Sequence, residues 1–174
     1  MTDTRATGWK IPLIFCGVVL GIVGLFSLLR TEPAVQVPEV PAPLLAQARA
    51  IVIDLNTAPE GSLWKERITA AGSGFASHAD KDTNLAFVIR DAVARQRFDA
   101  ACTAAVLVYD TPKRDAVLEE TAQAAAGDCS TLPWGVMAAH GMRDPFVQAR
   151  THEMLTERWN ACRDAAAQPQ REES

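Results

Sequence analysis

Aromatic residues are scarce in this 174-residue chain, where they make up 6% of the residues and include a single tyrosine. Strands are enriched in aromatic and β-branched residues, so this scarcity, together with abundant alanine, favours an all-α protein over a β-sandwich. An excess of basic residues is also missing, because 17 Lys and Arg stand against 21 Asp and Glu. Scattered charge with a net value of −4 argues against nucleic acid as a partner, since that binding needs a clustered basic face.

The sequence also lacks the short motifs of common catalytic and cofactor sites. It has no CxxC pair, no CxxCH haem site, no GxSxG nucleophile turn and no phosphate-binding glycine loop. Glu60, which precedes Gly61 and Ser62, could suggest a cell-wall-acting enzyme, but after Thr57 and Pro59 it fits a helix-capping box. We therefore expect no enzymatic activity and no cofactor, with a cell-wall-acting enzyme as the third hypothesis.

One long hydrophobic run, residues 11–29, contains no charged residue. As a helix it would be about 28 Å long, which is enough to cross the hydrocarbon core of a bilayer. A cleaved signal peptide is the alternative, but its apolar region is normally shorter, and the first small-x-small site, 46–48, lies far beyond the run. Cys16 lies inside the run after bulky Phe15, which is the wrong context for a lipidation signal. We predict an uncleaved transmembrane helix.

The charges flanking this run predict its orientation. Arg5 and Lys10 precede it, whereas Arg30 is the only basic residue between the run and Arg49. The positive-inside rule then places a tail of residues 1–10 in the cytoplasm and the remainder outside it. In a bacterium this would be the periplasmic side of the inner membrane.

The predicted transmembrane helix carries small residues at a spacing that permits close helix packing. Gly17 and Gly21 form a small-xxx-small pair, which can support a homodimer through this helix. Glycine is also common in membrane helices without such a role.

A proline-rich segment follows, at residues 30–43. It contains four prolines, which favour extended polyproline-like structure and predict a semi-rigid stalk. We expect the stalk to carry a helical soluble domain over residues 44–167, with a disordered tail at 168–174.

Hydrophobic periodicity and helix-end signals predict a series of helices in the soluble domain. The first spans 44–55, and the second begins at the capping box and ends at Gly72 or Gly74. A third begins at Asp82 or Thr83, with a bend near Arg97, and later helices begin near residues 111, 133 and 144. The β-branched stretches 50–55 and 104–110 offer an alternative, because they could be buried parallel strands of an α/β domain.

Part of this domain resembles a tetratricopeptide repeat. Phe98, Ala101, Ala105 and Pro112 resemble the second half of such a repeat, and residues 85–94 would form its first helix. The match covers about thirty residues, lacks the small residue expected near Ile89, and shows no second copy at a 34-residue period. The resemblance implies a protein-binding helical hairpin without chemistry of its own.

Three cysteines belong to the soluble domain, and helical-hairpin geometry selects a pair among them. Antiparallel packing of the helices around residues 141–144 brings residue 129 near residue 157, within about a turn of Cys162. Cys102 is offset by about 10 Å from the position opposite Cys129, too far for a disulfide. We predict a Cys129–Cys162 disulfide, with three free buried thiols as the alternative.

Methionine and histidine are concentrated between residues 137 and 154. Thioether and imidazole side chains suit Cu(I), so a periplasmic copper-handling domain is the second hypothesis for function. Its five candidate ligands are Met137, His140, Met142, His152 and Met154. His152 and Met154 cannot chelate together, because residues two apart point to opposite sides of a helix. The structural alternative is that methionines fill gaps in the core and His152 is a hydrogen-bonded structural residue.

The first hypothesis for function is an accessory or scaffold subunit of an envelope complex, which acts by binding other membrane or envelope proteins. Tethering would raise the effective concentration of the domain toward such neighbours, and helical hairpins supply grooves for a partner segment. Trp134 is a candidate binding anchor, although a core position is the alternative.

Overall fold

The computed structural model describes residues 35–55, 59–74 and 76–167. Within these ranges the chain forms seven α-helices and no strand, so the all-α prediction is confirmed and the strand alternative for 50–55 and 104–110 is wrong. The helices are α2 (Ala42–Ala50), α3 (Pro59–Gly72), α4 (His78–Ala94), α5 (Phe98–Val106), α6 (Thr111–Ala125), α7 (Leu132–His140) and α8 (Pro145–Ala167). Within these ranges, none of the helices combines the length and the hydrophobicity that a membrane span requires. The predicted transmembrane helix, 11–29, and the tail, 168–174, lie outside the described residues.

The first helix predicted from the sequence, residues 44–55, extends further toward the C-terminus than the helix in the structure. The structure ends α2 at Ala50, and Ile51 already has extended backbone angles, so 51–55 is not helical. Three consecutive β-branched residues, Ile51, Val52 and Ile53, explain this end, because such side chains lose rotamer freedom in a helix.

The start of α4 also differs from the prediction. Ser77 caps this helix by accepting a hydrogen bond from the Asp80 backbone N–H at 3.2 Å, so neither Asp82 nor Thr83 is the cap. The predicted bend near Arg97 is a reversal between α4 and α5, with Gln96 at a positive φ of 58° and the Arg97 N–H donating to the Ala92 carbonyl. The next helix begins near residue 111, as predicted, and Asp110 caps it by accepting a hydrogen bond from the Lys113 backbone N–H.

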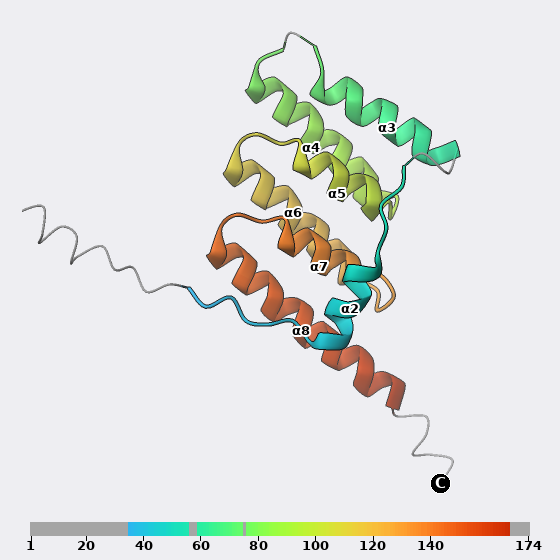
Figure 1. The fold of residues 1–174 in the computed structure, drawn as a ribbon, viewed down its shortest axis with the longest axis vertical. Helices are drawn as coiled ribbons and strands as arrows, with labels where there is room; N and C mark the ends of the chain where they lie inside the picture. The colour runs from blue at the N-terminus through green and yellow to red at the C-terminus, as the bar shows by residue number, and fades with distance from the viewer. Residues whose placement is uncertain (1–34, 56–58, 75, 168–174) are drawn as a thin grey trace, which may run out of the picture. The chain divides into compact units, whose positions relative to one another are not determined.

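The helices form two rows of alternating members (Figure 1). Helices α4, α6 and α8 contact one another in sequence, and so do α3, α5 and α7. Helix α2 packs against α7, at the end of that row opposite α3. Residues 51–55 therefore carry the chain from one end of the row back toward the other.

A pair of buried aspartates gives the fold an internal repeat. Asp82, 2% exposed, accepts hydrogen bonds from the backbone N–H groups of Tyr109 and Asp110 at 2.8 and 3.0 Å. Asp115, 3% exposed, accepts equivalent bonds from Arg143 and Asp144 at 3.0 and 2.8 Å. Each carboxylate thus fixes the turn before a later helix, α6 for Asp82 and α8 for Asp115, although the sequence showed no second copy of the repeat-like pattern.

Small side chains let these helices approach closely. Four alanines of α5, at positions 100, 101, 104 and 105, are fully buried between the neighbouring helices. In α7, a Cβ added to Gly135 would lie 2.7 Å from Leu155 and 3.3 Å from the Ala122 carbonyl oxygen. Alanine abundance in this sequence therefore reflects close helix packing.

The C-terminal part of the predicted stalk belongs to the helical domain. Val40 is 6% exposed and joins the hydrophobic cluster formed by α2, α7 and α8. The Pro38 carbonyl oxygen lies 2.8 Å from Nδ1 of His152 in α8. Residues 38–43, expected to belong to a spacer, are therefore packed against the domain or open its first described helix.

Candidate functional site

An apolar groove of about 430 Å³ lies where α5, α6 and α7 meet the extended segment 51–55. Its walls are side chains of Cys102 and Val106 from α5, Leu118 from α6, Met137 from α7, and Ile53 from the extended segment. Pockets of this size that combine apolar walls with few polar groups are typical ligand or partner sites.

Arg114 supplies the charged group of this groove. Its Nη2 donates a 3.0 Å hydrogen bond to the Gly141 carbonyl oxygen, whereas its Nε is buried and has no hydrogen-bond partner. Within the described residues, the structure shows no ion pair for this guanidinium. Arg114 is half-buried, and a guanidinium without an ion pair beside apolar walls favours a carboxylate, which accepts charge-assisted hydrogen bonds.

The rim of the groove is hydrophobic and open to solvent. Val106 and Leu107, at the C-terminal end of α5, are 66% and 53% exposed. Exposed apolar residues beside an apolar groove differ from isolated surface residues, because together they form a continuous surface that a partner can cover.

Cys102 lines the groove but is not equipped to act as a nucleophile. Burial and the negative charge of Asp99 raise the pKa of its thiol to about 12. The reactive form of cysteine is the thiolate, so this thiol remains protonated and unreactive near neutral pH.

Sequence reasoning singled out Met137 and Cys102 for other roles and missed the remaining groove residues. Val106, Leu107 and Ile53 belong to apolar stretches that read as core, and Arg114 lies in the first turns of a helix, where an arginine is normally a solvated surface residue. The groove becomes visible only when α5, α6 and α7 are assembled around the extended segment.

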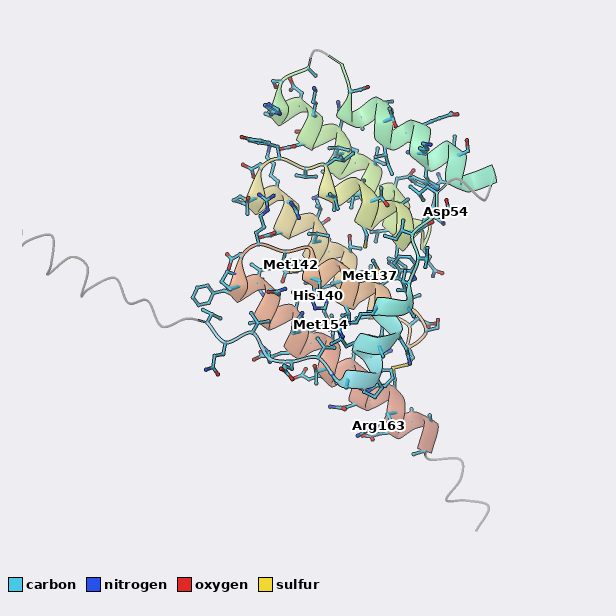
Figure 2. All side chains as sticks on the ribbon, in the orientation of Figure 1. Asp54, Met137, His140, Met142, Met154 and Arg163 are labelled. Carbon is cyan, nitrogen blue, oxygen red and sulfur yellow. A yellow bond between two sulfur atoms is a disulfide. The ribbon has the colours of Figure 1, made fainter. Side chains whose placement is uncertain are left out.

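The structure divides the predicted copper ligands into two groups. Figure 2 shows Met137, His140, Met142 and Met154 in the region of α7 and α8. Met142 is buried in the core and accepts a hydrogen bond from the Thr151 hydroxyl at 3.7 Å, while Met137 and Met154 are half-buried against the core. The rings of His140 and His152 come together, with centroids 5.4 Å apart. Among the described residues, no three His, Cys, Asp or Glu side chains converge as a metal-ligand group.

The predicted Cys129–Cys162 disulfide is confirmed, with Cα atoms 5.9 Å apart. It joins the turn between α6 and α7 to α8.

The remaining site residues predicted from the sequence have different outcomes. Trp134 is half-buried and packs against the core, in line with the structural alternative for this residue. Ser62 is exposed on α3, while Gly17, Gly21 and the side chain of Glu60 lie outside what the structure describes.

Comparison of this chain with protein family models, with curated proteins and with solved structures found no match.

Proposed function

We propose that this protein is a membrane-anchored helical adaptor, an accessory or scaffold subunit that binds another envelope protein through the groove of α5, α6 and α7. The observation that supports it is the combination of apolar walls, an exposed hydrophobic rim and the Arg114 guanidinium, for which the described residues provide no ion pair. The disulfide supports an extracytoplasmic position, since disulfides persist in oxidising compartments.

The chemistry of the groove suggests the kind of segment that it receives. Apolar side chains of the partner would cover Val106 and Leu107, and a carboxylate would pair with Arg114. We infer an apolar segment that carries an acidic residue or ends in a carboxylate.

The predicted anchor and the resemblance to a tetratricopeptide hairpin agree with this role. A tether at the membrane surface confines the domain to two dimensions and raises its effective concentration toward membrane-bound partners. Packed helical hairpins present grooves that accept helices or extended segments.

Purification of the full-length protein from detergent-solubilised membranes of its source tests the proposal. Val106→Gln places a polar group on the groove rim, and Phe87→Gln is the matched control, because Phe87 is 67% exposed on α4 outside the groove. We expect a stoichiometric partner to copurify with the parent protein and the control, and to be lost with Val106→Gln.

A second variant tests the proposed carboxylate. Arg114→Gln should weaken partner retention while preserving the helical circular dichroism spectrum. Equal partner retention by the parent protein, Val106→Gln and Arg114→Gln would contradict the proposal. Peptidoglycan cleavage by the purified protein alone would favour the cell-wall enzyme instead.

A further inference from the structure

A second pocket, of about 300 Å³, brings two histidines from neighbouring helices together. His140 ends α7 and His152 is the eighth residue of α8, and the remaining walls come from residues 37–40, Ala42 and Leu45. The two rings meet nearly edge to face, at an interplanar angle of 79°.

Hydrogen bonding determines which nitrogen of His152 carries the proton. Its Nδ1 lies 2.8 Å from the Pro38 carbonyl oxygen, which only accepts hydrogen bonds, so Nδ1 is the donor. In the neutral ring Nε2 then carries the lone pair. His152 is 5% exposed, and Nε2 is buried without a hydrogen-bond partner. A histidine that donates one nitrogen to a backbone carbonyl and leaves the other free has the arrangement of a metal ligand.

His140 supplies the second imidazole of this pocket, from the solvent-exposed C-terminal end of α7. Glu39, on the segment that enters the domain, lines the same pocket and brings a negative charge to it.

The separation of the two rings fits a shared ion. Two imidazoles on one tetrahedral ion, each bound through a nitrogen at about 2.1 Å, have ring centres roughly 5 Å apart. The observed separation is 5.4 Å. The methionines are not needed in this arrangement, because Met142 is buried in the core and no methionine lines this pocket.

We propose that His140 and His152 form a two-imidazole site for a divalent transition-metal ion of the Zn²⁺ and Cu²⁺ class, with water completing the coordination. Imidazole suits these ions, whereas Mg²⁺ and Ca²⁺ prefer oxygen ligands. Because His152 also holds Pro38, a bound ion fixes the entering segment 37–40 against α7 and α8. This site is separate from the groove, and its test is independent of the proposed function.

Titration of the purified full-length protein with Zn²⁺, followed by calorimetry, tests the site. We expect one ion per chain, with affinity at least about tenfold weaker in His140→Gln and in His152→Gln, which each remove one of the two ligands. His78→Gln is the matched control, since His78 stacks on Tyr109 away from this pocket and should leave binding unchanged. Cu²⁺ should bind more tightly than Zn²⁺, and its electron paramagnetic resonance spectrum should show coupling to two nitrogens.

His140 is exposed, so His140→Gln keeps the test valid even if His152→Gln unfolds the domain by releasing Pro38. Saturable Zn²⁺ binding that is unchanged in His140→Gln would overturn the proposal. So would the absence of saturable binding by the folded parent protein.

Discussion

The two ends of the helical stack are held together by different means. At the end formed by α2, α7 and α8, a disulfide joins Cys129 to Cys162, and Arg158 donates a 2.9 Å hydrogen bond to the Ala126 carbonyl oxygen. At the α3 end, the contacts include side-chain packing and an ion pair of 2.6 Å between Arg67 and Asp91, and the described residues show no disulfide there. The end that carries the disulfide is also the end against which the N-terminal segment, residues 38–40, packs.

This difference predicts that the two ends of the stack differ in their resistance to unfolding. The entering segment contacts α8 through His152 and packs Val40 into the core cluster shared by α2, α7 and α8. The proposed membrane tether would apply its force at this end, where the disulfide and the Arg158 hydrogen bonds hold the helices together. The α3 end is the one from which we expect local unfolding to begin.

The largest expected effect comes from removing the disulfide. The Cys129→Ala, Cys162→Ala double variant should lower the free energy of unfolding by about 3–4 kcal/mol, because the bridge closes a 33-residue loop. Urea denaturation of oxidised, reduced and variant protein measures this. A decrease in the free energy of unfolding smaller than that caused by a surface substitution would show that the α2, α7 and α8 end does not depend on the disulfide.

Removal of either repeated aspartate comes next. Asp115→Ala leaves the Arg143 and Asp144 N–H groups without their acceptor and should cost about 2–3 kcal/mol. Asp82→Ala should cost a similar amount through Tyr109 and Asp110. Hydrogen exchange should show local opening at 143–144 in the first variant and at 109–110 in the second. Opening confined to one site in both variants would contradict the equivalence of the two hairpins.

Substitution of two glycines by alanine should destabilise the domain for different reasons, close packing at Gly135 and backbone strain at Gly74. Gly135→Ala should cost about 1–2 kcal/mol, because its Cβ would lie 2.7 Å from Leu155. Gly74→Ala should cost about 1 kcal/mol for a different reason: the position has a φ of 87° but has open space around it. Thermal melts distinguish the causes, because Leu155→Ala should reduce the penalty of Gly135→Ala and leave that of Gly74→Ala unchanged.

The smallest effect is expected at a surface ion pair between the two hairpins. Arg90 donates two hydrogen bonds, of 2.8 and 2.9 Å, to the Glu120 carboxylate. This interaction lowers the pKa of Glu120, so its stabilisation is present above the ordinary value of 4.5 and is lost as pH falls through the lower folded value. Both side chains are exposed, so a double-mutant cycle at pH 7 should give below about 1 kcal/mol. An equal coupling at pH 2 would contradict this assignment.

Several elements of the fold could be predicted from local sequence signals. Pro59, Pro133 and Pro145 each occur in the first turn of a helix, and Gly72 ends α3, where steric and hydrogen-bonding preferences act within a few residues. The disulfide followed from the same reasoning, because two antiparallel helices of known lengths determine which residues lie opposite each other.

The remaining features depend on contacts between distant segments. Asp82 looked like a helix cap, yet its acceptor atoms serve backbone groups 27 and 28 residues away. The packing of α2 on α7 also has no local signal, since it joins the N-terminal helix to a helix near the other end of the chain. For the same reason, the groove and the histidine pocket could not be assembled from periodicity alone.

Photo-crosslinking in intact membranes tests the adaptor role most directly. A photoreactive residue at position 106 of the full-length protein, compared with one at position 87, probes the groove rim and an equally exposed site outside it. We predict one discrete adduct from position 106, none from position 87, and loss of that adduct when Arg114→Gln is added. The same adducts from both positions, or none from position 106, would contradict the account.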